Sequence, residues 1–337
     1  MKVYEIQKGS TGLDGLRRAE RPDPQPGAHE VLVRVRATAL NYRDQGILTG
    51  RYFGGTVTRN LIPLSDGAGD VIAIGPGVSR FKAGDRVIPT FFQVWIDGKR
   101  SGPRHALGSP LDGTLAEYIV LHEDGFVLVP PSLLLEEAAT LPCAGLTAWN
   151  ALMVAGKPVR PGDTVLCQGT GGVSLFALQF ARAAGARVII TSSSDDKIER
   201  ARKLGASDGI NYQRIPEWEK EVARLTDGRG VDQVIEVGGK GTLARSFEAV
   251  GVGGKVALIG VLTGSAMDAN PHGLMFKDAS LHGIGVGNRT MLEDMIRAIE
   301  VNKIKPVIDR NFPFENAAEA YREHAAGNFM GKVVIRL

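Results

Sequence analysis

The stretch Thr164-Val-Leu-Cys-Gln-Gly-Thr-Gly-Gly-Val-Ser174 decides the fold of this chain. Its first four residues are apolar or β-branched and predict a buried parallel strand. A tight turn follows, built on glycines at 169, 171 and 172. After the turn, apolar residues recur with the spacing of one helix face, at Val173, Phe176, Ala177, Phe180, Ala181 and Ala184. A strand, a glycine turn and a helix in this order predict a dinucleotide-binding site.

Dinucleotide binding at such a turn has a simple physical basis. Absent side chains let a pyrophosphate approach the backbone, and the unpaired N–H groups of the first helical turn point at it. The expected cofactor contacts in the turn are Gly169, Thr170, Gly171, Gly172 and Val173. Ser174 replaces the third glycine of the usual pattern, so strand and helix must accommodate a small side chain there. The alternative is a plain strand–helix turn, but the βα units that follow favour the nucleotide site.

Length and composition set the outer limits of function. The chain has 337 residues, of which 43% are hydrophobic, enough for two domains with separate cores. A formal net charge of +3 is too small to indicate nucleic acid or an anionic membrane as a partner. Two cysteines without paired spacing favour a reducing cytoplasm. No signal peptide and no membrane-spanning run is recognised, so we expect a soluble, cytoplasmic protein.

The chain divides by pattern into two parts. Residues 1–127 contain short strands between glycine turns, which predict a small barrel. Residues 91–112 are polar and rich in Gly and Pro, and they predict a long loop that is either functional or merely mobile. From residue 164 onward, apolar strands alternate with helices. This alternation predicts an α/β fold with a doubly wound parallel sheet.

Short motifs in a characteristic order extend this picture over nearly the whole chain. They lie at residues 39–44, 66–69, 83–87, 113–118, 141–147 and 331–335, in addition to the glycine turn. Together they resemble the medium-chain dehydrogenase/reductase superfamily, which includes zinc alcohol dehydrogenases and zinc-free quinone oxidoreductases. The resemblance implies a GroES-like catalytic β-barrel over 1–127, a Rossmann cofactor-binding domain over 128–287 and a return to the catalytic domain over 288–337. It also implies a homodimer, because a strand near residues 280–286 lies beside its symmetry mate in dimers of the family.

The resemblance also implies that both zinc sites of the zinc branch are lost. Asn41 stands where that branch has a Cys, and Ser65 and Asp66 stand where it has a His-Glu pair. Only Cys143 remains of the soft ligands that zinc prefers. The loop at 91–112, where the family's four-cysteine lobe would lie, contains no cysteine. We therefore expect no metal.

Asn41 and Tyr52 are the catalytic candidates. Asn41 matches a position that lines the family's cleft, and Tyr52 matches a tyrosine that enoyl reductases of the family use near the substrate. A phenol can donate a hydrogen bond to a carbonyl or a proton to the α-carbon. The alternative for Tyr52 is a half-buried packing residue. Arg43 replaces the Ser or Thr that relays the alcohol proton in the zinc enzymes, and Cys143 has the apolar neighbourhood of a buried small hydrophobe rather than a nucleophile.

The cofactor prediction is NADPH. NAD-specific domains place an acid about 20 residues after the glycine turn, and Ser193 occupies that place here. Lys197 and Tyr212 match the residues that grip the 2′-phosphate in NADPH-dependent quinone oxidoreductases, and Thr147 matches a residue near the nicotinamide. The alternative for Lys197 is a solvated helix residue, with serines that only cap the helix.

The sequence thus predicts an NADPH-dependent oxidoreductase without catalytic zinc that reduces the C=C bond of an enone, enal or quinone. An alcohol dehydrogenase or carbonyl reductase is the alternative enzyme. A catalytically silent relative with a structural or RNA-binding role is the alternative outside catalysis. The intact glycine turn favours an enzyme acting on a small molecule, and the lack of a basic stripe argues against nucleic acid.

Overall fold

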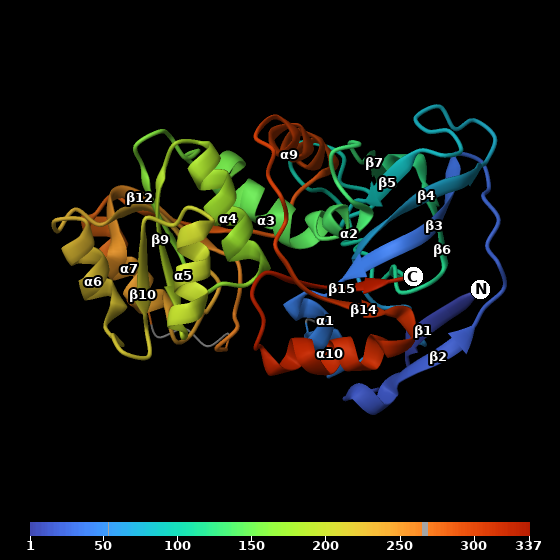
Figure 1. The fold of residues 1–337 in the computed structure, drawn as a ribbon, viewed down its shortest axis with the longest axis horizontal. Helices are drawn as coiled ribbons and strands as arrows, with labels where there is room; N and C mark the ends of the chain where they lie inside the picture. The colour runs from blue at the N-terminus through green and yellow to red at the C-terminus, as the bar shows by residue number, and fades with distance from the viewer. Residues whose placement is uncertain (53, 265–268) are drawn as a thin grey trace. The chain divides into compact units, whose positions relative to one another are not determined.

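The computed structural model describes residues 1–52, 54–264 and 269–337. The chain forms two compact units. The first comprises residues 1–146 and 287–337, and the second comprises residues 147–286. Within the described ranges, no helix is long and apolar enough to cross a membrane. Figure 1 shows how the red C-terminal strands return to the blue and teal strands of the first unit.

The first unit is built on a seven-stranded sheet with the order β14-β15-β3-β4-β5-β7, in which β6 also pairs with β3. Its strands are β3 (Glu30–Ala39), β4 (Asp66–Ile74), β5 (Arg86–Pro89), β6 (Tyr118–His122), β7 (Phe126–Leu128), β14 (Ile308–Pro313) and β15 (Lys332–Arg336). A separate antiparallel pair joins β1 (Lys2–Ile6) to β2 (Leu16–Glu20). The long strand β3 is shared by β4, β6 and β15, so it ties the C-terminal strands into the unit.

The helices of the first unit pack around this sheet. They are α1 (Tyr42–Leu48), α2 (Leu135–Ala138), α9 (Arg289–Val301) and α10 (Ala317–Ala326). The main core of the unit joins Leu40 and Ile47 of the α1 region to Tyr321 of α10 and Val333 of β15. Burial of such side chains stabilises the fold by about 1.5–3 kcal/mol each. Segments far apart in the sequence therefore share one hydrophobic core.

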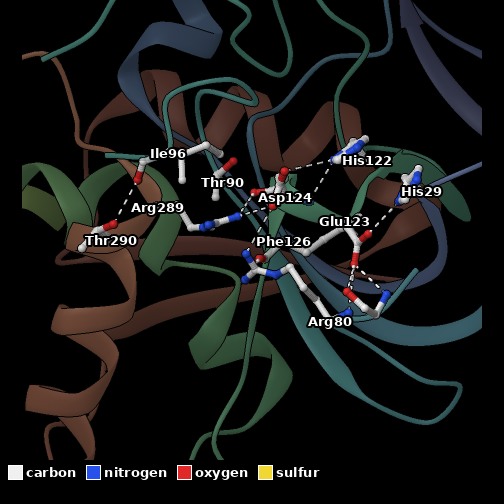
Figure 2. A network of polar contacts seen from close by, with 12 residues as sticks. His29, Arg80, Thr90, Ile96, His122, Glu123, Asp124, Phe126, Arg289 and Thr290 are labelled. Carbon is white, nitrogen blue, oxygen red and sulfur yellow. Dashed lines mark hydrogen bonds and ion pairs between the residues drawn. The ribbon is translucent and has the colours of Figure 1, made fainter. Parts of the chain in front are cut away.

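The polar stretch at residues 91–112 is a long loop, as predicted, and it folds back on itself. An isolated β-bridge joins Phe92 to Ala106. Near its start, the Ile96 carbonyl accepts a hydrogen bond of 3.1 Å from Oγ1 of Thr290, in the first turn of α9 (Figure 2). The loop is therefore attached to the body of the unit by hydrogen bonds as well as by its two ends.

The second unit contains a six-stranded parallel sheet with the order β10-β9-β8-β11-β12-β13. Its strands are β8 (Thr164–Cys167), β9 (Arg187–Ser192), β10 (Asp208–Asn211), β11 (Val231–Glu236), β12 (Val250–Leu258) and β13 (Ser280–Gly283). The strand order reverses between β8 and β11, and ligands of such sheets bind at the carboxyl ends of strands at this switch point. The predicted doubly wound parallel sheet is confirmed.

Helices alternate with these strands. They are α4 (Gly172–Ala183), α5 (Asp195–Lys203), α6 (Trp218–Leu225), α7 (Leu243–Ala249) and α8 (His272–Phe276). A helical run over 141–154 precedes the sheet. It consists of α3 (Leu146–Trp149) between two π-helical stretches, and the boundary between the two units falls inside α3. α4 follows β8, which lies third among the six strands of the sheet, so the glycine turn lies near the centre of the sheet.

Candidate functional site

The glycine turn has open space beside the protein backbone at two of its residues. Gly169 has φ of +72°, in the left-handed region that favours glycine. Gly171 has an ordinary φ of −78° and caps the N-terminus of α4. A Cβ atom placed on either residue would meet no other atom within 4 Å. Packing within the protein therefore does not require glycine at 171, whereas a ligand lying against the turn does.

Ser174 fits the place of the third glycine by making a hydrogen bond. Its Oγ donates to the carbonyl oxygen of Gln168 at 2.5 Å, and the residue is buried. The serine therefore ties the first turn of α4 to the end of β8. Because the first turn of a helix has backbone N–H groups without intrahelical partners, this arrangement presents donors and positive dipole to an anion.

A buried carboxylate orders the switch point between β8 and β11. Glu236 is fully buried and accepts hydrogen bonds from Nε2 of Gln168 at 2.8 Å, and from the backbone N–H groups of Gly238 at 2.7 Å and Gly239 at 2.9 Å. It therefore joins the ends of two neighbouring strands and holds the turn after β11. Sequence reasoning missed this residue. Its signal was a charged side chain directly after the apolar pair Val234 and Ile235 at the end of a strand.

The predicted 2′-phosphate residues come to one edge of the parallel sheet. Ser193 follows the end of β9 and is exposed, and Tyr212 follows the end of the neighbouring β10 with 39% of its surface exposed. Lys197 lies in the first turn of α5, where its backbone N–H donates to Oγ of Ser194, the capping residue. The alternative was that the serines only cap the helix. Ser194 does cap α5, whereas Ser193 does not and lies at the end of the strand.

An arginine that sequence reasoning missed lies at the same edge. Nη2 of Arg214 donates to Oδ1 of Asp195 at 2.7 Å, and Nδ2 of Asn211 donates to the same oxygen at 2.9 Å. The pairing offsets the negative charge of the first acid in α5. This acid would otherwise repel a phosphate bound nearby. The remaining predicted cofactor residues, Thr147 and Thr170, are buried, and Gly172 and Val173 are partly exposed in the first turn of α4.

The first unit holds a buried ammonium group beside the predicted catalytic asparagine. Nζ of Lys332 donates to the carbonyl of Leu40 at 2.8 Å, to Oδ1 of Asn41 at 2.6 Å and to Oδ2 of Asp66 at 3.0 Å. The lysine is 3% exposed and Asp66 is fully buried. The antiparallel register of β15, β3 and β4 brings these residues together, since Ala39 lies opposite both Val334 and Asp66.

Asn41 presents an unused hydrogen-bond donor as a result. An ammonium group can only donate, so Oδ1 of Asn41 must face Lys332 and Nδ2 must face away. The Nδ2 atom is buried and has no hydrogen-bond partner among the described residues. The backbone N–H of Asn41 donates to Oδ2 of Asp44 at 2.8 Å, which holds the residue at the start of α1. Such an orphaned donor is costly unless a ligand uses it.

Tyr52 and Arg43 lie in the wall of a cavity of about 310 Å³ in the same unit. The guanidinium carbon of Arg43 is 5.4 Å from the centre of the Tyr52 ring and 4.8 Å from that of Phe91. Asn41 is not among the described residues that line this cavity. Asn41 precedes α1, and after the helix the chain turns back, so that the backbone N–H of Tyr52 donates to the carbonyl of Gly46 at 3.0 Å.

The positions that the resemblance matches to zinc ligands include Ser65, Asp66 and Cys143. Burial and the nearby carboxylate of Asp66 raise the pKa of the Cys143 thiol far above its ordinary value. Ser65 is fully buried, and its hydroxyl is not a strong metal ligand. Among the residues that the structure describes, no group of three or more His, Cys, Asp or Glu side chains is arranged to hold a metal ion.

Comparison with known proteins gives the same assignment for both units. The family model of the alcohol dehydrogenase GroES-like domain matches residues 27–131, and that of the zinc-binding dehydrogenase matches residues 172–301. A zinc-type alcohol dehydrogenase-like protein of Schizosaccharomyces pombe is 41% identical over 344 residues, covering 99% of each chain. A quinone oxidoreductase of Pseudomonas aeruginosa is 33% identical over 335 residues, covering 96% of each.

The fold comparison agrees. A solved structure of an NAD-dependent alcohol dehydrogenase superposes with a TM-score of 0.90 at 35% identity, covering 100% of both chains. The predicted pairing of a GroES-like domain with a Rossmann-like domain is thereby confirmed. The chain belongs to the medium-chain dehydrogenase/reductase superfamily of oxidoreductases.

Proposed function

We propose that this protein is an NADPH-dependent oxidoreductase that reduces the C=C bond of an enone, enal or quinone without a catalytic zinc ion. The observation that carries the proposal is the pair of Asn41 and Lys332. The buried ammonium turns the amide of Asn41 so that its Nδ2 donor is left without a partner among the described residues. A carbonyl oxygen is the group that such a donor binds.

The donor set does not fit zinc, although relatives carry zinc in their names. A tetrahedral zinc site needs thiolate or imidazole ligands. Here Nζ of Lys332 already lies 2.6 Å from Oδ1 of Asn41 and 3.0 Å from Oδ2 of Asp66. A dication placed between the same oxygens would be repelled by the ammonium, and each charge would be buried.

The reaction class follows from the lack of a Lewis acid in this proposal. A simple ketone is poorly polarised by hydrogen bonds alone, whereas an enone spreads the developing charge into an enolate. When bound, the reduced nicotinamide supplies a hydride to the β-carbon. The Nδ2 donor of Asn41 stabilises the charge that develops on the oxygen, and the phenol of Tyr52 is the proposed proton donor to the α-carbon.

The preference for NADPH rests on the edge of the sheet at Ser193. A hydroxyl there can donate to a phosphate, and in this proposal Lys197 adds a charge-assisted hydrogen bond and Tyr212 a neutral one. The Arg214–Asp195 pair at 2.7 Å reduces the repulsion that the α5 acid would exert. One relative in the comparison is named an NAD-dependent enzyme, so cofactor choice must be measured for this chain.

The test is an NADPH-oxidation assay with matched substrates, cyclohexenone and cyclohexanone, with and without a chelator. We expect the enone to react faster, chelation to have no effect, and elemental analysis to find no stoichiometric zinc. Asn41→Ala should lower kcat/KM about a hundredfold, and Tyr52→Phe should lower kcat. The exposed Asn302→Ala is the matched control. A faster saturated ketone would favour the carbonyl reductase instead, and unchanged turnover in both variants would refute the assigned roles.

A further inference from the structure

The cavity of the first unit is lined by three arginines, and no Asp or Glu is among its described lining residues. Arg43, Arg59 and Arg104 contribute the three guanidinium groups. The apolar part of the wall includes the rings of Tyr52, Phe91 and Phe92. A cavity of this composition attracts an anion that also carries a flat apolar group. The proposed hydride transfer alone does not require such charge.

Arg43 is the buried member of the three. It is 7% exposed, and its guanidinium lies over the rings of Phe91 and Tyr52. Its Nη1 donates to the carbonyl of Leu107 at 3.0 Å, while its Nε is buried without a hydrogen-bond partner among the described residues. The nearest carboxylate is that of Asp44, with Oδ1 at 3.5 Å from Nη1. Nη2 of Arg43 also donates to the Ser109 carbonyl at 3.3 Å, so the arginine is held in the cavity wall by the protein and contributes its positive charge there.

Arg59 and Arg104, the two more exposed arginines of the cavity lining, differ in whether a carboxylate neutralises their charge. Arg59 pairs with Asp112, with Nη1 and Oδ1 at 2.7 Å. Arg104 is exposed, and no ion pair of its side chain is found in the described part of the chain. Burial and the charge of Arg104 lower the pKa of Arg100, whose guanidinium lies over the Phe92 ring at 5.1 Å. The rim on this side is therefore electropositive.

The loop that carries Arg104 is anchored beside that residue, where the backbone N–H of Gln93 donates to the His105 carbonyl at 3.0 Å, and also near its start. Residues 91–112 are attached to α9 through Ile96 and Thr290, and the backbone N–H of Arg289 donates to the Trp95 carbonyl at 3.1 Å. As Figure 2 shows, the side chain of Arg289 also binds Asp124: its Nη1 donates to Oδ1 at 2.6 Å. A guanidinium on an anchored wall loses less freedom when it binds a ligand.

We propose that this cavity binds the carboxylate of the substrate, so that the natural substrates are short oxo-enoates. The proposal rests on the proposed function and specifies its substrate class. A volume of about 310 Å³ lies at the small end of ligand pockets and suits a short molecule. Arg104 and Arg43 bind the carboxylate and the aromatic rings contact the adjoining carbons, which leaves the ketone oxygen at the other end of the molecule for Nδ2 of Asn41, outside the cavity lining. Hydride adds to one carbon of the C=C bond and a proton to the other, so the carboxylate is unchanged.

The experiment compares (E)-4-oxo-2-pentenoate with its methyl ester, which has the same reacting bond and no charge. We expect the wild-type kcat/KM to favour the acid by about tenfold or more, as one charge-assisted hydrogen bond is lost in the ester. Arg104→Ala should lower the value for the acid about tenfold and leave that for the ester within about twofold. Arg17→Ala, an exposed arginine of β2 that is not among the residues lining the cavity, is the matched control. Arg43→Gln should reduce the same ratio if the variant folds.

The outcomes separate the two proposals. Equal use of acid and ester by the wild type, or an acid preference that survives Arg104→Ala, overturns the carboxylate site and leaves the enone reductase standing. If neither compound is reduced, the proposed function fails. Calorimetric titration of the oxo-enoate into wild-type and Arg104→Ala protein then decides the site by itself: weaker binding to the variant supports it, and equal or absent binding overturns it.

Discussion

The two units each bury one lysine, and the two lysines have different surroundings. In the second unit, Nζ of Lys255 donates to the carbonyls of Ala151 and Ala155, both at 2.7 Å, and of Lys157 at 2.8 Å. In the first unit, Lys332 donates to one carbonyl and to two side chains, an amide and a carboxylate. Both ammonium groups are almost fully buried.

The comparison separates a structural lysine from a positioning lysine. Lys255 satisfies carbonyls at the end of the helical run 141–154, where a cation also complements the helix dipole. Burial lowers the pKa of Lys255 to about 8. Lys332 instead has Asp66 as a counter-ion and fixes the orientation of Asn41. We infer that the first lysine acts on stability alone, and that the second acts on stability and on chemistry.

The largest expected effect is that of Lys332→Met. Removal of the ammonium leaves Asp66 as an unpaired buried carboxylate, which should lower the free energy of unfolding by about 3–5 kcal/mol. Turnover of the enone should also fall, because nothing then orients the Asn41 amide. Chemical denaturation and kcat/KM measure the two effects. The double variant with Asp66→Asn should regain much of the stability but not the activity, and recovery of both would show that Lys332 is only structural.

Lys255→Met should affect stability alone. The variant leaves three carbonyls without their donor, and we expect the free energy of unfolding to fall by about 2–3 kcal/mol at pH 7. The loss should grow as pH rises from about 8 toward the ordinary lysine pKa of 10.5, because in that window the unfolded wild type binds more protons than the folded wild type, so its stability rises with pH while that of the variant does not. Kinetic constants of the folded variant should stay within about twofold of wild type. A selective loss of kcat would contradict the structural assignment.

His324 extends the comparison to acid stability. Burial, and secondarily the charge of Lys332, lower the pKa of His324 to about 3 from an ordinary 6.5. The unfolded state therefore binds the proton first, and stability should fall as pH drops from 6.5 toward 3, by about 2 kcal/mol at pH 5. Urea denaturation from pH 7 to 4 measures this. His324→Gln should flatten the acid limb, and an unchanged slope would exclude His324 as its cause.

The smallest expected effect concerns a lysine that is only partly buried. Lys197→Ala should raise the KM for NADPH about tenfold, the loss of one charge-assisted contact, and leave that for NADH nearly unchanged. Steady-state kinetics with both cofactors checks this, with the exposed Lys203→Ala on the same helix as control. Equal losses with both cofactors, or a wild type that prefers NADH, would contradict the NADPH proposal.

The sequence by itself determined the parts that depend on local patterns. The apolar strands, the helix spacing and the glycine turn predicted the parallel sheet and its crevice, because periodicity and backbone freedom act between near neighbours. Resemblance added the GroES-like unit, which the family match confirms. Glycine at 171 was correctly placed in the turn, and the structure adds that no packing contact requires it.

Only the tertiary structure brought Lys332 to Asn41, across 291 positions, and to Asp66, across 266 positions. The same holds for the cavity, where Arg43 of α1 meets Arg104 of a distant loop. Neither arrangement has a local signature, because the lysine cluster depends on the register of β15, β3 and β4, and the cavity depends on how the loop at 91–112 folds back. A lysine in an apolar strand is evident in the sequence, but the partner that makes its burial tolerable is chosen by strand register and packing.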